Sequence, residues 1–458
     1  MPSSLVEDAI AHYDELLATR FQPDTWWREH AAEIKRHWFD EAPLGAFVLR
    51  PRMLDEANYL ETCASLAPVA RALAIAAERL ATDEALRRTL GIPDYLEPLL
   101  AIDAAHGQPP CLGRLDGIPT RDGRVVIIEF NSEPKSVPFQ YEVERAFDRL
   151  AITQAFGERY RVRTVDLYDN VHRALRTGGP REVSAVAVVD KAVWQSPRRA
   201  STFRPLMYAA ARGTPVVFVD PEELDYRGGE LRASGIRVDM VAFVDWELLI
   251  NSRKRLVKVL KAIADGAVGV FAGLSRGLLA SYKVVFELLS SAAYRDMFPP
   301  DVHEALSRHV PWTRLLRERT TDRGGATVDL LPFVADHRDG LVIKPSGGGG
   351  GGNVTIGRDV DTATWSAAIH RGVTQNWIVQ DLAVPARESF PVADASGRIA
   401  YHELACELTP YVWNGSRIEG ILSRVVAGPV MFDFGDRPIG LDNGIETATW
   451  IISRRAPA

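Results

Sequence analysis

A run of six consecutive glycines, residues 347–352, constrains the fold of this chain more than any other feature. An apolar segment at 341–345 enters the run, and a second segment of strand character at 354–357 leaves it. Strands on both sides disfavour a flexible linker between domains. No Gly-Lys-Ser/Thr follows the glycines, which excludes a P-loop, and no helix follows, which excludes a Rossmann turn. The flanks therefore predict a β-hairpin with a glycine tip.

Such a hairpin is suited to closing over phosphate groups. Without Cβ atoms, backbone N–H groups can approach phosphoryl oxygens closely. Lys344, at the end of the entering strand, adds a positive charge at the same place. A hairpin that closes over ATP would also exclude water. We therefore expect residues 344–357 to form a lid over ATP, with a purely structural loop as the alternative.

Composition sets the broad class of protein. The chain has 458 residues, 46% apolar and 25% charged, which indicates a globular protein of about two to four domains. Its 54 basic and 60 acidic side chains give a net charge of −6, so no basic excess is available for nucleic acid. Three scattered cysteines fit a reducing compartment. Without a signal-peptide pattern or a long apolar stretch, we expect a cytoplasmic protein with no nucleic-acid or membrane partner.

The periodicity of apolar residues predicts an α/β fold with α+β character. Residues 1–105 have helical spacing, including an aromatic stripe at 26–38, and we expect a helical N-terminal region. Residues 106–150 contain a predicted hairpin, with strands at 111–118 and 125–131 around an Asp-Gly turn.

The second part of the chain alternates strands with helices and turns. Residues 151–265 have a strand–helix–strand pattern, which favours a parallel α/β layer that serves as scaffold or as a wall of the substrate site. Its predicted elements are strands at 183–189, 214–219 and 238–244 and a helix at 200–212. Residues 266–458 are expected to form the nucleotide-binding part, with a helix over 278–291 that contains Lys283.

Glu129-Phe130-Asn131 ends the predicted hairpin with two oxygen-bearing side chains on one face. Residues two apart on a strand point the same way and lie about 6–7 Å apart. Carboxylate and amide oxygens suit Mg²⁺. The pattern alone is weak, and a polar strand end is the plain alternative. It gains weight from Arg114 and Asp116, which can share the same face from the preceding strand.

Three further segments, taken together with the E-x-N motif, form a combination that is found in a known family. They are Lys283, Lys344 before the glycine run, and the segment 377–382 with the sequence Trp-Ile-Val-Gln-Asp-Leu. With the E-x-N motif they resemble the nucleotide-binding half of ATP-grasp enzymes. E-x-N lies about 215 residues before Lys344, an order that resembles the circularly permuted group of eukaryotic-type glutathione synthetases, glutathionylspermidine synthases and bacterial relatives. The resemblance covers about residues 110–445.

The resemblance implies a function for each matching position. Substrate-binding positions are Arg114, Asp116, Ser136 and Arg424. Metal-binding positions are Glu129 and Asn131. Positions that bind ATP are Lys283, Lys344, Ser346, Gly349, Gly350, Gly351, Asn353, Gln380, Asp381 and Leu382. In the family two lysines contact phosphate or adenine, and the hinge strand binds adenine through its backbone.

Two positions depart from the family pattern. Relatives begin the glycine loop with a metal-binding glutamate, where this chain has Gly348. A further metal ligand must come from elsewhere, and Glu407 or Glu403, which share a strand face, is the candidate; we favour Glu407. The late lysine that follows the substrate arginine is also missing, with Val426 near that position.

Three arginines are the candidate catalytic residues, because a guanidinium matches a carboxylate in two-pronged geometry. They are Arg114, Arg276 and Arg424. Arg276 is explained equally well as an ordinary surface arginine. The resemblance implies that a substrate carboxylate attacks the γ-phosphate of ATP to give an acylphosphate, from which an amine displaces phosphate.

The expected function is thus an ATP- and Mg²⁺-dependent carboxylate–amine ligase that releases ADP and phosphate. Its partners would be a small-molecule carboxylate and an amine, such as amino acids or peptides. An ATP-dependent phosphotransferase is one alternative. A nucleotide-binding protein without catalysis, suggested by Gly348, is another. The assembly stays open, with a homodimer as the commonest form.

Overall fold

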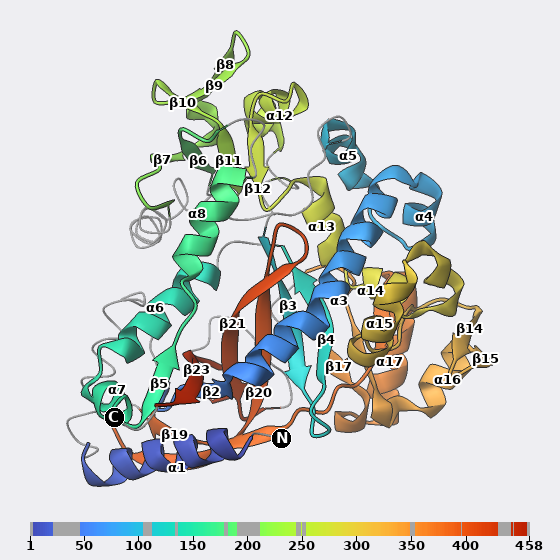
Figure 1. Ribbon diagram of the computed structural model, residues 1–458. Helices are drawn as coiled ribbons and strands as arrows, with labels where there is room; N and C mark the ends of the chain where they lie inside the picture. Colours follow the sequence, from blue (N-terminus) through green and yellow to red (C-terminus); the bar gives the residue numbers. More distant parts are fainter. Residues whose placement is uncertain are drawn as a thin grey trace.

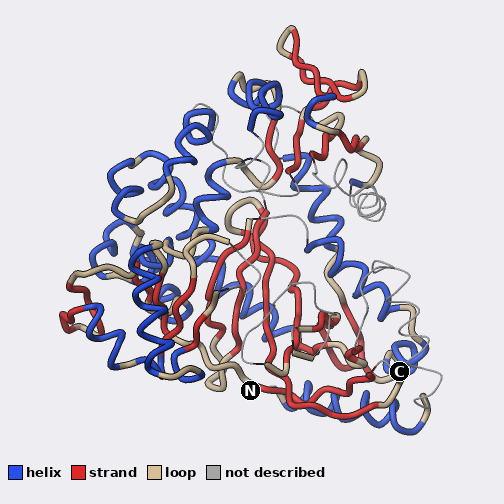
Figure 2. Tube along the Cα trace, turned by 180° about the vertical axis from the view of Figure 1, so that it is seen from behind, coloured by secondary structure: helices blue, strands red, loops and turns tan. Residues whose placement is uncertain are grey.

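The computed structural model has a mixed α/β architecture around a large central sheet (Figure 1). It describes residues 3–21, 46–103, 112–132, 136–177, 182–189, 211–243, 249, 253–348, 353–394, 396–428, 441–442 and 444–455. A smaller parallel sheet lies at one end of the molecule, and helices surround the central sheet (Figures 1 and 2).

Within the described residues, the central sheet has seven strands, all antiparallel to their neighbours. Its main path runs β1-β19-β20-β21-β22, and the β3–β4 hairpin joins through β20. The strands are β1 (Ala46–Val48), β3 (Leu112–Pro119), β4 (Val125–Asn131), β19 (Arg387–Asp394), β20 (Ile399–Trp413), β21 (Arg417–Val426) and β22 (Ile445–Thr447).

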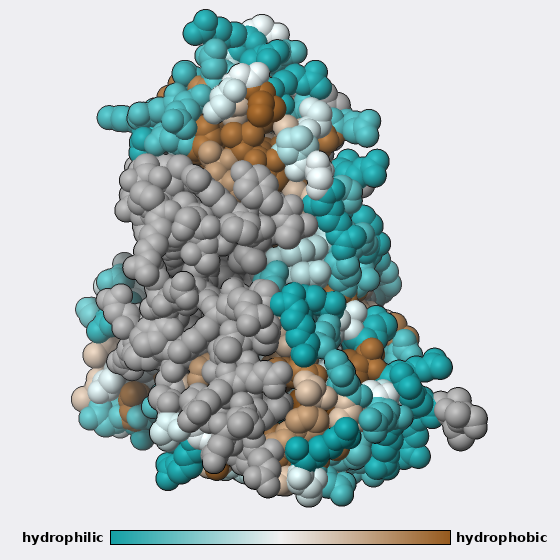
Figure 3. All heavy atoms as spheres, turned by 90° about the vertical axis from the view of Figure 1, so that its left-hand side faces the viewer, coloured by the Kyte–Doolittle hydropathy of each residue, from teal (hydrophilic) through white to brown (hydrophobic). Residues whose placement is uncertain are grey.

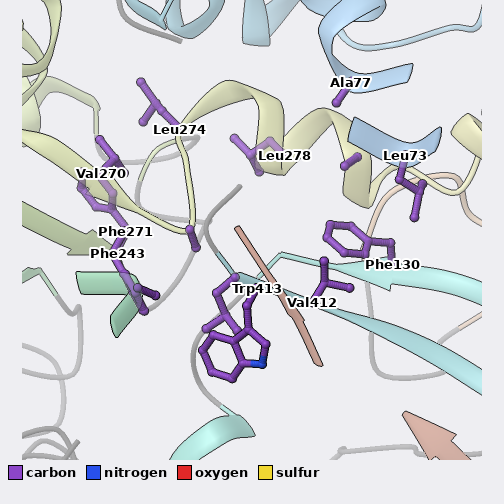
Figure 4. Close-up of a cluster of buried hydrophobic side chains, with 14 of the residues drawn as sticks. Leu73, Ala77, Phe130, Phe243, Val270, Phe271, Leu274, Leu278, Val412 and Trp413 are labelled. Atoms are coloured by element: carbon purple, nitrogen blue, oxygen red, sulfur yellow. The ribbon is translucent and has the colours of Figure 1, made fainter. Parts of the chain in front are cut away.

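The predicted hairpin at 111–131 is confirmed as β3 and β4. The N–H of Thr120 donates to the Arg124 carbonyl at 2.8 Å, and Gly123 turns the chain with φ at 81°. Phe130, between the two polar residues of E-x-N, belongs to the main hydrophobic core with Leu73 (Figure 4). A Cβ at Gly113 would lie 2.0 Å from the Phe130 ring, so the bare glycine makes room for it. One hairpin face is therefore apolar, which leaves the other for polar residues.

The predicted parallel layer is also confirmed. Its strands pair in parallel in the order β12-β11-β6-β7 and are mostly buried. They are β6 (Val186–Val189), β7 (Val216–Val219), β11 (Met240–Phe243) and β12 (Gly269–Phe271), with α12 (Val257–Ala264) nearby. The helix expected at 200–212 lies almost wholly outside the described residues. Figure 3 shows the side of the molecule that carries α6 and α8. Its described surface is mostly hydrophilic, with apolar residues gathered near this sheet and again in the lower part of the view.

The described part of the N-terminal region is helical as predicted, except for two short strands that were not expected. Its helices are α1 (Ser4–Thr19), α3 (Glu56–Thr82), α4 (Glu84–Thr89), η1 (Asp94–Leu96) and α5 (Glu97–Asp103). β1 pairs with β19, and β2 (Arg52–Asp55) pairs in parallel with β23 (Thr449–Arg454). Strands of three and four residues are too short to show a period in the sequence. The aromatic stripe at 26–38 lies outside the described residues.

Among the described helices, α3 is long and apolar enough to cross a membrane by length and composition alone. In this structure it contacts α13 (Ser275–Ser281), α14 (Val285–Ser290) and β21. Its buried residues belong to the main hydrophobic core. Core packing therefore accounts for its apolar character.

The glycine run lies between paired strands, as predicted. β16 (Leu341–Lys344) and β17 (Thr355–Ile356) are antiparallel, with Val342 opposite Ile356. They form a second antiparallel sheet in the order β13-β18-β16-β17, with β13 (Thr313–Leu315) and β18 (Ile378–Asp381). Helices α16 (Leu330–Asp336) and α17 (Thr362–Thr374) pack on it.

The single helix predicted over 278–291 is wrong, because the chain breaks between α13 and α14. Lys283 lies in this break. Its backbone N–H donates to the Ser346 carbonyl at 2.7 Å instead of continuing a helix. A contact with a residue far along the chain, invisible in local periodicity, thus ends the helix.

The remaining elements complete the edges of the molecule. Beside the central sheet lie α6 (Ser136–Asp148), α7 (Ala151–Phe156), α8 (Leu167–Thr177) and β5 (Tyr160–Arg163) (Figure 1). The others are η2 (Pro221–Glu223), β8 (Leu224–Arg227), β9 (Glu230–Ala233), β10 (Ile236–Val238), η3 (Arg253–Leu256), η4 (Ala292–Met297), η5 (Pro300–Val302), α15 (His303–His309), β14 (Thr320–Arg323), β15 (Ala326–Asp329), η6 (Arg338–Gly340) and η7 (Gly357–Asp359).

Candidate functional site

One face of the central sheet carries charged and polar side chains from β4 to β22. Side chains directly opposite each other on paired strands point to the same face. This register places together Asp116 with Glu129, Arg114 with Asn131, Tyr411 with Arg114, Glu407 with Arg424, and Arg424 with Glu446. We call these residues the polar row. Its order follows the strands: β4, β3, β20, β21 and β22.

At the hairpin end of the polar row, Asn131 joins two carboxylates. Its Nδ2 donates to Asp116 Oδ2 and to Glu129 Oε1, each at 2.9 Å. Arg114 Nε donates to Asp116 Oδ1 at 2.8 Å, and both of these side chains are buried. Two predicted substrate residues, Arg114 and Asp116, therefore share one hydrogen-bonded cluster with the E-x-N motif.

Two lysines from distant segments reach this cluster. Lys283 Nζ lies 3.1 Å from Glu129 Oε2, and Lys344 Nζ donates to the Ile128 carbonyl at 3.0 Å. Burial alone would raise the pKa of Glu129, but the charges of Lys283 and Lys344 hold it at about 2. Burial lowers the pKa of Lys344 to about 8, although the Glu129 carboxylate opposes this shift. The structure thus brings together a carboxylate that stays ionised and two buried ammonium groups.

Arg424 lies on β21, between Glu407 and Glu446 in the polar row. Its Nε and Nη2 each lie 2.6 Å from Glu407 Oε2, and Nη2 lies 3.6 Å from Asp116 Oδ2. Burial raises the pKa of Glu407 to about 7, although Arg424 opposes the shift. Arg424 and Asp116 connect Glu407 to Asn131, because Asp116 accepts from Asn131 and faces Arg424. The role of Glu407 as a metal ligand stays a prediction.

Ser346, just before the glycine run, forms hydrogen bonds with the segment that contains Lys283. Besides the bond from the Lys283 N–H, the N–H of Val284 donates to Ser346 Oγ at 3.3 Å. Lys283 Nζ donates to the Gly348 carbonyl at 2.7 Å. Gly348 has φ at +83° and Asn353, at the far end of the run, has φ at 62°. The predicted positions Gly349, Gly350 and Gly351 lie outside the described residues.

The predicted adenine hinge lies on β18, next to Lys344 on β16. Gln380 is buried and donates to a hydroxyl on β13 at 2.9 Å. Asp381 pairs with Arg323 at 2.8 Å. The N–H of Leu382 donates to the Gly340 carbonyl at 2.8 Å. Because that N–H is already bonded, adenine would have to use other backbone groups of the hinge in this conformation.

Arg276 and Ser136 lie in different surroundings. Arg276 is buried, not at the surface, and pairs with Glu78 at 2.6 Å and Asp103 at 3.1 Å. These ion pairs join α13 to α3 and α5, and they include no residue of the polar row. Ser136 begins α6, where its carbonyl accepts a bond from Tyr411 at 3.1 Å. Ser136 therefore lies beside the polar row, and the described partners of Arg276 lie outside it.

The oxygen donors fit Mg²⁺ only in part. Among the described residues, no three His, Cys, Asp or Glu side chains converge closely enough to hold a metal ion. Glu129 is ionised and Asn131 is its neighbour, but Lys283 lies against the same carboxylate. Mg²⁺ commonly takes one or two protein oxygens and completes its shell with water and phosphate. The pair therefore suits a metal that arrives with a phosphorylated ligand.

The charge of the site favours an anion. Four basic side chains lie in or against the polar row, and they are Arg114, Lys283, Lys344 and Arg424. Burial raises the pKa of Glu407 and of Glu446, so these two carboxylates carry less negative charge to balance the basic side chains. Near neutral pH the buried cations therefore outweigh the carboxylates.

Sequence analysis missed Glu446, which lies directly opposite Arg424. It belongs to no motif. Only the pairing of β21 with β22 places it in the site, and that register has no local signal in the sequence.

No protein-family model matches the chain, and no curated protein matches its sequence. Solved structures do resemble it. A glutathione synthetase-like effector from Globodera pallida, in its apo form, has a TM-score of 0.59 at 10% identity, over 94% of this chain and 98% of that one. A gamma-glutamylcysteine synthetase candidate from Methylobacillus flagellatus KT has a TM-score of 0.41 at 8% identity, over 88% and 89%, too low to inform the fold. The chain thus has a glutathione synthetase-like fold.

Proposed function

We propose that this protein is an ATP- and Mg²⁺-dependent carboxylate–amine ligase of the circularly permuted ATP-grasp type. The observation that carries the proposal is the meeting of Lys283, Lys344 and the Glu129-x-Asn131 motif beside the root of the glycine run. Ammonium groups beside hard oxygen donors suit a nucleoside triphosphate and its metal. The glutathione synthetase-like fold supports the same class of enzyme.

In this proposal the lysines bind ATP and the arginines bind the carboxylate. Lys344 and Lys283 neutralise phosphate oxygens, and the glycine run closes over them. Arg114 and Arg424 hold the substrate carboxylate, and their bonds to Asp116 and Glu407 fix the planes of the guanidinium groups.

The reaction then has two steps. A carboxylate oxygen attacks the γ-phosphorus, which forms an acylphosphate and releases ADP. The amine nitrogen attacks the acyl carbon, loses a proton, and phosphate leaves. Glu407, with a pKa of about 7, is suited to accept that proton.

Glu129 and Asn131 are the residues that would hold Mg²⁺, which when bound neutralises charge on the phosphates. Lys283 would then exchange its contact with Glu129 for one with phosphate. The ionised state of Glu129 favours this exchange, because no proton has to leave first.

The test is turnover of ATP with a panel of carboxylates and amines. We expect ADP and phosphate to be released in an amine-dependent way, and Lys344→Met to abolish release. Lys258→Met, at an exposed lysine on α12, is the matched control. Release of AMP and pyrophosphate would contradict the mechanism.

Hydroxylamine separates the ligase from a phosphotransferase. Only an acylphosphate yields a hydroxamate, so we expect one when the carboxylate, ATP and Mg²⁺ are present. ATP that binds but is never consumed would instead indicate a nucleotide-binding protein without catalysis.

A further inference from the structure

The polar row ends under helix α6 in a group of buried oxygens that lack partners. From this arrangement we propose that the β22 end of the polar row binds the ammonium group of the amine substrate. The inference rests on the proposed function, because it assigns the opposite end of the same site.

Helix α6 covers this end of the row. Ser136, Gln140 and Glu144 are four residues apart and share one face of the helix. Gln140 Nε2 donates to Glu144 Oε1 at 2.9 Å and reaches the Thr447 carbonyl of β22 at 3.5 Å. The bond from Tyr411 to Ser136 joins the same helix to β20. The face of α6 with these polar residues is therefore held against β20 and β22.

Five oxygens on α6, β20 and β22 have no hydrogen-bond partner among the residues that the structure describes. They are Ser136 Oγ, Gln140 Oε1, Glu144 Oε2, Thr409 Oγ1 and Glu446 Oε2. Gln140 and Thr409 are fully buried. A buried polar atom without a partner is costly, and a group of them indicates a missing ligand or ordered water.

These oxygens favour a ligand that donates hydrogen bonds. The amide oxygen of Gln140 and an ionised Glu446 can only accept hydrogen bonds, and the two hydroxyls can accept as well. An ammonium group has three donors and no acceptor, so it satisfies this set better than a carboxylate or a phosphate does. Burial raises the pKa of Glu446, with Arg424 opposing, and a bound cation would restore its charge.

The position along the polar row also fits the reaction. Lys283, Lys344 and Glu129 lie at the β4 end, and the arginines follow on β3 and β21. Glu446 lies one strand beyond Arg424. An acyl group held by the arginines would thus have phosphate on one side and the ammonium group on the other. The ammonium group gives one proton to the Glu446 carboxylate before its nitrogen attacks, and gives the second to Glu407 as the C–N bond forms.

The first experiment needs no turnover. Glycinamide and acetamide differ in that only glycinamide carries an ammonium group, so ligand-observed NMR titrations compare the two on the full-length wild-type protein. We expect glycinamide to bind at least tenfold more tightly. Equal binding, or none, would overturn the proposal.

Variants then locate the site. We expect Glu446→Gln and Gln140→Leu each to weaken glycinamide binding about tenfold or more, the size of one hydrogen bond to a charged group. Gln154→Leu makes the same change as Gln140→Leu at an exposed position of α7 and should leave binding unchanged. Unchanged affinity in Glu446→Gln would contradict the assignment.

Affinity for an ATP analogue with Mg²⁺, measured by calorimetry in the same variants, keeps the two proposals apart. We expect it to stay within twofold of wild type. Wild type that binds glycinamide but no ATP would refute the proposed function alone. If the wild type turns ATP over and the Glu446→Gln variant has the same KM for the amine, this inference alone would be refuted.

Discussion

Under the proposed function, folding and ATP binding favour different protonation states of Lys344. Burial lowers its pKa from 10.5 to about 8 in the folded chain. Between these values the unfolded chain binds the proton more readily, so the contribution of Lys344 to the free energy of unfolding rises with pH. Phosphate binding needs the charged form. Higher pH should therefore favour folding at this residue and disfavour nucleotide binding.

We predict that the Kd for an ATP analogue rises about tenfold from pH 7 to pH 9, because about a tenth of Lys344 is charged at pH 9. Isothermal titration at both values measures the change. Lys344→Met should bind weakly at both values with little pH dependence. An equal Kd for wild type at pH 7 and pH 9 would count against a direct contact.

The contribution of Glu129 to the free energy of unfolding is lost at low pH. Its pKa in the folded protein is about 2, below the ordinary value of 4.5, so its stabilising effect is complete above 4.5 and disappears as pH falls toward 2. We predict that Glu129→Gln lowers the free energy of unfolding at pH 7 by roughly 3 kcal/mol, because two buried lysines lose their counter-charge. Urea unfolding at pH 7 and pH 3 checks this, and the difference between variant and wild type should shrink at pH 3.

At the scale of the element, the β3–β4 hairpin depends on two faces that differ. The apolar face needs Gly113, since a Cβ there would lie 2.0 Å from the Phe130 ring. The polar face holds the residues of the E-x-N motif in register with Arg114 and Asp116. A change on the apolar face should therefore disturb the polar one.

We predict that Gly113→Ala destabilises the protein by about 1–3 kcal/mol through overpacking and also reduces ATP turnover. Gly340→Ala is the control, because a Cβ there would meet no atom within 4 Å. Chemical denaturation and a turnover assay measure both effects. Wild-type stability in Gly113→Ala would show that Phe130 can move aside without cost.

At the scale of the whole molecule, the two ends of the chain share one core. Tyr13 of α1 is fully buried, bonds the Leu49 carbonyl at 3.1 Å and packs with its ring centroid 5.9 Å from that of Trp450. β1 and β2 add to sheets formed by C-terminal strands. The N-terminal region and the site-bearing sheet should therefore unfold together.

We predict that Tyr13→Ala lowers the free energy of unfolding by about 3–5 kcal/mol and keeps a single transition. Tryptophan fluorescence and far-ultraviolet circular dichroism, followed on the same denaturant series, should give coincident curves. Two separate transitions would show that the N-terminal region unfolds independently.

The features that the sequence revealed are those with a local signal. Two apolar runs around an Asp-Gly turn predicted the hairpin, and strands on both sides of the glycines predicted their position. β1 and β2 are too short for a period. The helix break at Lys283 depends on Ser346, more than sixty positions away, and Glu446 enters the site only through strand register. These features depend on contacts between distant segments, which no local pattern encodes.

The bonds from the Lys283 segment to Ser346 have a practical consequence for protein engineering. They hold the first residues of the glycine run against the Lys283 segment. Under the proposed function, shortening the run after Gly348 in steps would change the length of the loop and leave these bonds in place. The dissociation rate of a nucleotide analogue, measured across such a series, would separate the contribution of the loop from that of the lysines.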